Sequence, residues 1–138
     1  MLRGAKRQWS DRGVQDTAAV EWDRPAVWVH GGLHPANAVV AGGILAGVVD
    51  FGELCASDPA TDLSAAWLLL PAGAATRLFD AYAGAGEAAV RRARGWALMR
   101  CMGLLEIGRS GELGPPGGKR TWKRAGAAAL DRLSASLP

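Results

Sequence analysis

The chain has 138 residues, of which 49% are hydrophobic and 21% charged, and its formal net charge is +3. This length suits one domain that can bury a core, and the small basic excess is not the footprint of a nucleic-acid-binding protein. The apolar stretch at residues 65–71 is too short to cross a bilayer, and no apolar leader follows the basic start. We therefore expect a cytoplasmic protein with no nucleic-acid or membrane partner. Cys55 and Cys101 are far apart and suggest neither a disulfide framework nor a zinc site.

Short strands are predicted in the first half of the chain. A short helix over residues 14–22 is expected to end before Pro25, because the residue preceding a proline avoids the helical conformation. Strands are then indicated by the β-branched residues Val27, Val29, Val39, Val40, Ile44, Val48 and Val49. Gly42-Gly43 suits a two-residue hairpin turn, so residues 39–49 are predicted to form a hairpin within one small sheet.

Helices are predicted to fill the second half. We expect them over residues 58–70, 72–83, 87–108 and 121–136, with a flexible Gly- and Pro-rich loop over 109–120. Asp58 is a good N-cap and Pro59 suits a first helical turn. Arg91, Arg92 and Arg94 are expected on the wetter side of the third helix. The expected fold class is therefore α+β, mostly α, with a small β-hairpin followed by helices.

Three polar motifs surround the hairpin. Residues 30–37 read HGGLHPAN, residues 50–52 read DFG, and residues 58–63 read DPATDL. The polar loop that carries Asn37 follows one predicted strand, and Asp50 ends another. We therefore predict that Asn37 and Asp50 lie together at one end of the sheet.

This set of motifs resembles the catalytic core of the aminoglycoside phosphotransferase family, relatives of the protein kinases. That family reads HGDLHPxN, then a hairpin, DFG and DPxxDL. The matching positions are His30, Gly31, Leu33, His34, Pro35, Asn37, Asp50, Phe51, Gly52, Asp58, Pro59, Asp62 and Leu63. The resemblance runs from about residue 22 to about residue 136 and implies the C-terminal helical lobe of a kinase-like fold.

The resemblance implies a set of site residues. Asn37 and Asp50 would be the ligands of Mg²⁺ on ATP, since both offer oxygen donors, and Glu53 would add a carboxylate nearby. Asp62 would brace the catalytic loop by hydrogen bonds to its backbone, and Asp58 would cap a helix. The implied reaction transfers the γ-phosphoryl group of ATP to a hydroxyl of a small molecule. The resemblance does not specify the acceptor, which is left open among aminoglycosides, macrolides, choline, sugars and other alcohols. It also implies the family's link to antibiotic resistance.

The family's catalytic Asp falls on Gly32, which has no side chain to accept a proton. Losing a positioned base typically removes about a hundredfold to ten-thousandfold of rate, so this chain is expected to be catalytically impaired. His34 is a weak substitute, because the family has a histidine there beside its Asp. His30, also in the catalytic loop, is interpreted as a packing or hydrogen-bonding residue. A zinc site at His30 and His34 is not expected, since the loop glycines and Pro35 oppose a helix.

Residues 1–25 are too few for the N-terminal lobe with its glycine-rich loop and strand lysine. The whole chain is thus expected to be a single domain, the C-terminal lobe of a phosphotransferase, with the N-terminal nucleotide lobe absent. The alternative is a non-catalytic pseudokinase half that binds nucleotide and metal or a partner through an exposed apolar surface, with self-association as one outcome. A point change at Gly32 and an internal start at Met1 also remain open. The basic residues Lys119, Arg120, Lys123 and Arg124 are interpreted as a solvated helix start, with a phosphate site as the alternative.

Overall fold

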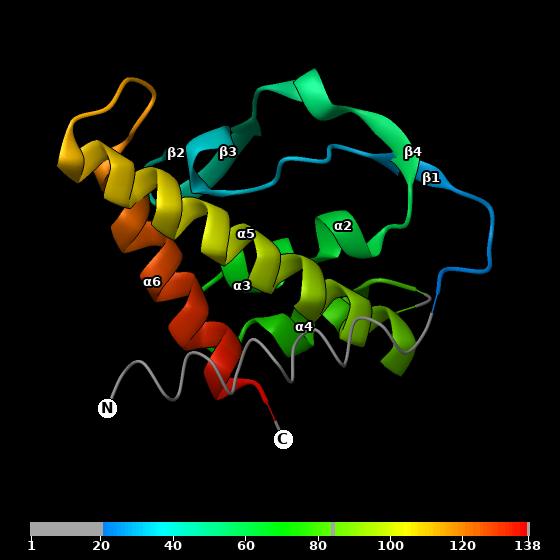
Figure 1. Cartoon of the computed structure of the whole chain (residues 1–138). Coiled ribbons are helices and arrows are strands. Elements are labelled where there is room, and N and C mark those ends of the chain that lie inside the picture. The colour runs from blue at the N-terminus through cyan, green and yellow to red at the C-terminus, as the bar shows by residue number, and fades with distance from the viewer. Residues whose placement is uncertain (1–20, 84, 138) are drawn as a thin grey trace.

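A computed structural model describes residues 21–83 and 85–137 and has the expected α+β, mostly helical fold (Figure 1). Its strands are β1 (Val27–Val29), β2 (Ala38–Ala41), β3 (Ile44–Val48) and β4 (Cys55–Ser57). Its α-helices are α2 (Ala60–Leu63), α3 (Ala65–Leu68), α4 (Ala75–Ala81), α5 (Glu87–Leu113) and α6 (Arg120–Ala135), and short 3₁₀ turns cover Pro35–Asn37 and Phe51–Glu53. Most of the helix expected over residues 14–22 lies outside the described residues.

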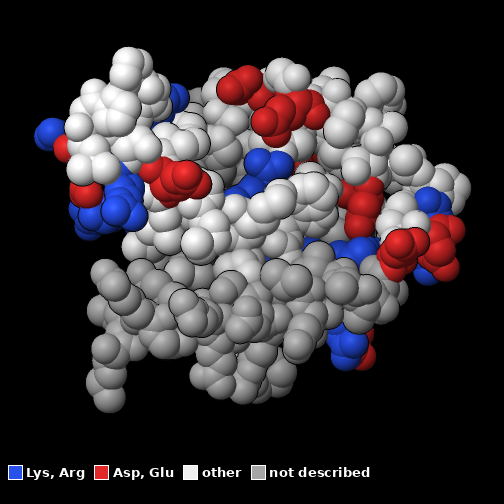
Figure 2. Space-filling model, viewed as in Figure 1, with Lys and Arg blue, Asp and Glu red and all other residues white. Residues whose placement is uncertain are grey.

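The surface mixes both signs of charge. Basic and acidic side chains are interspersed over the face shown in Figure 2. Within the described ranges, no helix combines the length and the apolar character that a membrane span requires.

The strands form two separate antiparallel pairs rather than the one sheet expected. β2 pairs with β3 across the Gly42-Gly43 turn, where both glycines have positive φ angles of 58° and 78°, as a tight hairpin turn requires. β1 pairs instead with β4, which the sequence did not predict. β4 is only three residues long and carries no alternating pattern, so nothing in its sequence marks it as a strand.

Two long helices form the base of the molecule. α5 and α6 pack against each other; in Figure 1 α5 runs diagonally from beside the β2–β3 hairpin to the lower right, and α6 lies below its left part. Their backbones approach closely because glycines lie at the contact. A Cβ atom on Gly126 would come within 3.0 Å of the Cys101 carbonyl oxygen, and one on Gly108 would clash with the backbone of Lys123.

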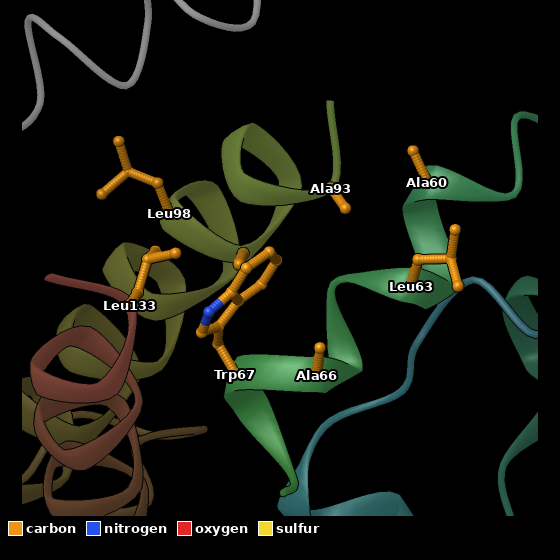
Figure 3. Packing of buried hydrophobic residues seen from close by; sticks show 8 residues of the cluster. Ala60, Leu63, Ala66, Trp67, Ala93, Leu98 and Leu133 are labelled. Carbon is orange, nitrogen blue, oxygen red and sulfur yellow. The ribbon is translucent and has the colours of Figure 1, made fainter. Parts of the chain in front are cut away.

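The hydrophobic core lies between the long helices and the short ones. Trp67 of α3 is 2% exposed and packs among small and branched side chains of α2, α5 and α6 (Figure 3). This cluster consists of Ala60, Leu63, Ala66, Trp67, Ala93, Ala97, Leu98 and Leu133. A second cluster joins Leu68 to Cys101, Leu104 and Ala129. Burial raises the pKa of the Cys101 thiol to about 12, so this cysteine is part of the packing.

Three predicted helix boundaries were wrong. The helix expected over 58–70 divides at Ser64, whose hydroxyl donates to the Thr61 carbonyl at 2.6 Å, a local bond that competes with regular helix geometry. The helix expected over 72–83 covers only Ala75–Ala81. The third helix continues five residues beyond Gly108 and ends at Gly114, which adopts a positive φ of 92°, the usual conformation of a glycine that terminates a helix. The flexible loop is correspondingly shorter.

Arg92 is buried, not on the wetter side of its helix as expected. Its Nε donates to Asp58 Oδ2 at 2.7 Å, and the two side chains are only 9% and 15% exposed. The other oxygen of Asp58 accepts from the Ala60 N–H at 2.9 Å at the start of α2. Asp58 therefore both begins α2 and anchors it to α5.

Replacing Arg92 by Met is expected to lower the free energy of unfolding by about 3 kcal/mol, because it leaves the Asp58 carboxylate buried without its partner. The neighbouring Arg91→Met is the matched control. Arg91 pairs with Glu87, whose side chain is 80% exposed, so its loss should change stability by less than about 0.5 kcal/mol. Urea unfolding of both variants measures the difference, and equal stabilities would contradict this reading of the pair.

Candidate functional site

The open end of the β2–β3 hairpin brings Asn37 and Asp50 together. Ala38 pairs with Val48, and the Val49 N–H donates to the Asn37 carbonyl at 3.0 Å. Asp50 follows directly and adopts the left-handed conformation, with φ 61° and ψ 69°. A non-glycine residue rarely adopts this conformation, and such strain is concentrated at functional sites.

Asp62 holds the loop over residues 30–37 in place. Its Oδ2 accepts from the His30 N–H at 2.6 Å, and its Oδ1 accepts from the Gly31 N–H at 3.0 Å. A carboxylate that accepts two backbone N–H groups makes strong, charge-assisted hydrogen bonds. Helix α2 thereby fixes the path of the loop through one side chain.

His30 joins the loop to the end of β3. Its Nδ1 accepts from the Gly32 N–H at 3.1 Å, and its Nε2 donates to the Val49 carbonyl at 2.9 Å. The ring is 7% exposed and stacks at a tilt on Phe51. Both nitrogens are engaged within the protein, so His30 positions the backbone on either side of the site.

A cavity of about 470 Å³ lies between this loop and the two long helices. Its lining residues are Gly32, His34, Asn37, Asp50, Glu53, Met99, Arg100, Gly103, Leu104, Ile107 and Trp122. Gly32, Asn37 and Asp50, singled out from the sequence, all face this one space. His30, Asp58 and Asp62 are outside the lining and support it.

Gly32 has room for a side chain. A Cβ atom there would lie 3.4 Å from Asn37 Nδ2 and 3.5 Å from Glu53 Oε2. The Asn37 amide also donates to the Gly32 carbonyl at 2.9 Å. A Cβ atom at this position would thus meet only ordinary van der Waals contacts, and no steric demand on the Cβ atom explains the glycine.

His34 is a partly desolvated member of the lining. Its Nδ1 is buried without a hydrogen-bond partner in the described part of the chain, and its ring meets the edge of Trp122 at 5.0 Å. Burial lowers the pKa of His34, and the nearby Arg100 guanidinium lowers it further. The imidazole is therefore kept neutral beside a cation.

The described residues offer few ligands for a metal ion. They contain no group of three His, Cys, Asp or Glu side chains that could hold one. Asp50 lies at the cavity with only a 3.4 Å contact from the Gly52 N–H to its carboxylate, and the Asn37 and Glu53 oxygens share the lining. Carboxylate and amide side chains thus share one space, and such groups are the types that supply oxygen ligands to Mg²⁺ in proteins.

Comparison with known proteins decides the family. The phosphotransferase enzyme family matches residues 2–100. The chain belongs to this family. No curated protein and no solved structure gives a significant match. The phosphotransferase match begins before the stretch that the motifs alone indicated and stops at Arg100, so the second half of α5 and all of α6 lie beyond it.

Arg100 and Trp122 were not found by sequence reasoning as members of this site. Arg100 is in the middle of a helix, and Trp122 is 85 residues after Asn37. Neither belongs to a motif, and only the packing of α5 and α6 brings them to the loop. The one local feature of the sequence that relates Arg100 to another residue of the lining is its position three residues before Gly103, which places both on one helix face.

The free energy of unfolding should depend on pH through His34. Because the pKa of His34 is lowered in the fold, the folded chain binds fewer protons than the unfolded chain as pH falls below about 6.5. Stability from this group is therefore complete above that pH and is lost as pH falls toward the lowered pKa. Urea unfolding of wild type and His34→Gln at several pH values should give a stability difference that changes between pH 7.5 and 5. A constant difference would contradict the shift.

Proposed function

We propose that this phosphotransferase lobe binds a Mg²⁺-nucleotide at Asn37 and Asp50 and holds a small-molecule alcohol in the adjoining cavity. The ancestral reaction is transfer of the ATP γ-phosphoryl group to that hydroxyl. One observation carries the proposal: Asn37, Asp50 and the position of the missing base, Gly32, line a single cavity. In this proposal residues 21–137 correspond to the C-terminal lobe of a phosphotransferase, which supplies the metal ligands and the acceptor cavity.

Mg²⁺ would be held by the oxygens of Asn37 and Asp50, with Glu53 near enough to contribute. When bound, it neutralises charge on the phosphates during transfer. The protein's own part is positioning. Asp62 and His30 fix the loop from both sides, and the Asn37–Gly32 hydrogen bond closes it.

Proton removal from the acceptor is the step for which the chain lacks its usual group. Gly32 has no carboxylate, and His34, although neutral, has one ring nitrogen 3.4 Å from the Asn37 amide and the other buried. We therefore propose that the chain by itself has little or no transferase activity.

Metal-dependent nucleotide binding tests the first part of this proposal. Calorimetry should detect ATP binding in the presence of Mg²⁺ and a loss of about tenfold or more in affinity on Asp50→Ala, because a charged ligand is removed. Asp131→Ala is the matched control, since Asp131 is an exposed residue of α6 outside the cavity. Binding that is indifferent to Mg²⁺ or to Asp50 would refute the site.

Restoring the base tests the second part. Gly32→Asp should raise turnover by about a hundredfold to ten-thousandfold when the N-terminal lobe of a relative is supplied, and a Cβ atom at position 32 would meet no neighbour closer than 3.4 Å. Phosphate transfer from labelled ATP to a panel of alcohols measures it, with unmodified chain plus the same lobe as the control. Robust turnover by the unmodified 138-residue chain would overturn the proposal of an impaired enzyme.

A second candidate function is a non-catalytic interaction module. The β2–β3 hairpin exposes apolar side chains, with Val40 63% and Ile44 73% exposed, and Trp28 of β1 is 76% exposed. The exposed apolar side chains of the hairpin are a candidate docking face, for a second lobe or another copy of the chain, and Trp28 is a separate exposed residue on the other strand pair. Nucleotide binding without turnover, even in Gly32→Asp, would favour this candidate.

A further inference from the structure

Arg100 differs from the other inward-facing arginines of the long helices. Arg92 pairs with Asp58 at 2.7 Å, Arg132 donates to the Trp67 and Leu68 carbonyls at 2.8 and 3.1 Å, and Arg94 donates to the Ser136 carbonyl. The Arg100 side chain is 17% exposed, and its single close acidic neighbour is Glu53, at 3.7 Å. Its Nε, like that of Arg94, is buried without a partner in the described ranges, but Arg94 also donates to the Ser136 carbonyl at 3.1 Å, whereas Arg100 has the 3.7 Å contact to Glu53.

The charge of Arg100 is thus poorly compensated. A guanidinium taken out of water is costly unless hydrogen bonds and an opposite charge replace its hydration. Glu53 offers a weak replacement, since its own side chain is 69% exposed and the contact exceeds hydrogen-bond distance. The field of Arg100 therefore acts in the cavity, where it contributes to the lowered pKa of His34.

The rest of the helical wall is apolar. Met99, Leu104 and Ile107 of α5 and the Trp122 ring of α6 face the cavity. A Cβ atom on Gly103 would meet nothing within 4 Å, so this part of the wall is open. At the rim, Lys119 lies over the Trp122 ring at 4.4 Å. The helical wall therefore offers an apolar surface for a carbon skeleton, and positively charged side chains lie beside it.

We propose that the acceptor bound in this cavity is a small organic anion, an alcohol whose carboxylate or phosphate group pairs with Arg100. This inference rests on the proposed function and specifies its substrate class. The carbon skeleton packs on the Trp122 and Ile107 wall, and the hydroxyl points toward Gly32 and Asn37. An ammonium group at the helical wall would meet Arg100, with Lys119 over the Trp122 ring, whereas the carboxylates of the lining, Asp50 and Glu53, belong to the part of the cavity where Mg²⁺ is proposed.

The same anion chemistry has a second source, the phosphates of the nucleotide. The experiment separates the two sources, because acceptor binding is measured without nucleotide and nucleotide binding is measured without acceptor. A matched pair of probes isolates the charge. The probes 4-hydroxybenzoate and 4-hydroxybenzylamine share a ring and a hydroxyl and differ in the sign of their charge.

Calorimetry on the 138-residue chain should give an affinity for the acid about tenfold or more above that for the amine, the size expected for one charge-assisted hydrogen bond. Arg100→Met should abolish the preference, and Arg109→Met, an exposed position on the same helix, should retain it. Glu53→Gln should strengthen acid binding, because Glu53 competes for Arg100. Loss of the fold would weaken acid binding, so a gain in affinity on Glu53→Gln separates an effect on binding from an effect on folding.

Gly103→Leu provides a variant that should fold at least as well as wild type. Leucine favours a helix more than glycine, and its side chain would extend into the open part of the cavity. Binding of the acid should be lost while the thermal unfolding midpoint is unchanged or raised. Retained binding would show that the probe lies elsewhere and would overturn the proposal.

Three other results would overturn it: no detectable binding of either probe, an equal or greater affinity for the amine, or a preference for the acid that survives Arg100→Met. If the wild-type chain binds the two probes equally while Arg100→Met weakens binding of ATP and inorganic phosphate, the anion belongs to the nucleotide and the acceptor proposal is wrong. Failure of Mg²⁺-ATP binding alone would count against the proposed function and leave the comparison of acid and amine valid.

Discussion

The site depends on one carboxylate that receives two backbone N–H groups. Asp62 accepts from His30 and Gly31, and this pair of bonds sets the direction of the loop. Gly31 has a φ of 84°, and a Cβ atom there would come within 2.5 Å of the Glu53 carbonyl oxygen. Only a glycine lets the loop lie this close to residue 53. Helix α2 is held in turn by the buried Asp58–Arg92 pair, so the loop rests indirectly on α5.

The long helices serve the core on one face and the cavity on another. Trp67, Leu98 and Leu133 fix their spacing, and glycines allow the close contact between them. The contrast among their arginines follows from this arrangement. Where a guanidinium meets a carboxylate or helix-end carbonyls, it stabilises the fold, whereas Arg100 faces a cavity and has only a distant partner. Such imperfect compensation is expected where a ligand supplies the missing charge.

The architecture of the loop and its chemical competence are separable. Asp62 accepts from the His30 N–H, and the His30 and Asn37 side chains both bond the Gly32 backbone, although Gly32 contributes no side chain. The backbone path is set by groups on either side of position 32, and the cavity exists without a base in it. A lobe of this kind can therefore retain binding after losing a catalytic group, because binding and proton transfer depend on different atoms.

The sequence by itself determined the family motifs, the α+β class and the meeting of Asn37 with Asp50, because a hairpin places residues on its two sides together through local geometry. It also determined that Asp58 begins a helix. Tertiary structure alone decided the pairing of β4 with β1, the burial of Arg92 and the presence of Arg100 and Trp122 beside the loop. These features join residues distant in sequence, and no periodicity or capping signal records which faces of two helices will meet. The division of the expected 58–70 helix at Ser64, where the buried hydroxyl bonds the Thr61 carbonyl, is likewise seen only in the structure.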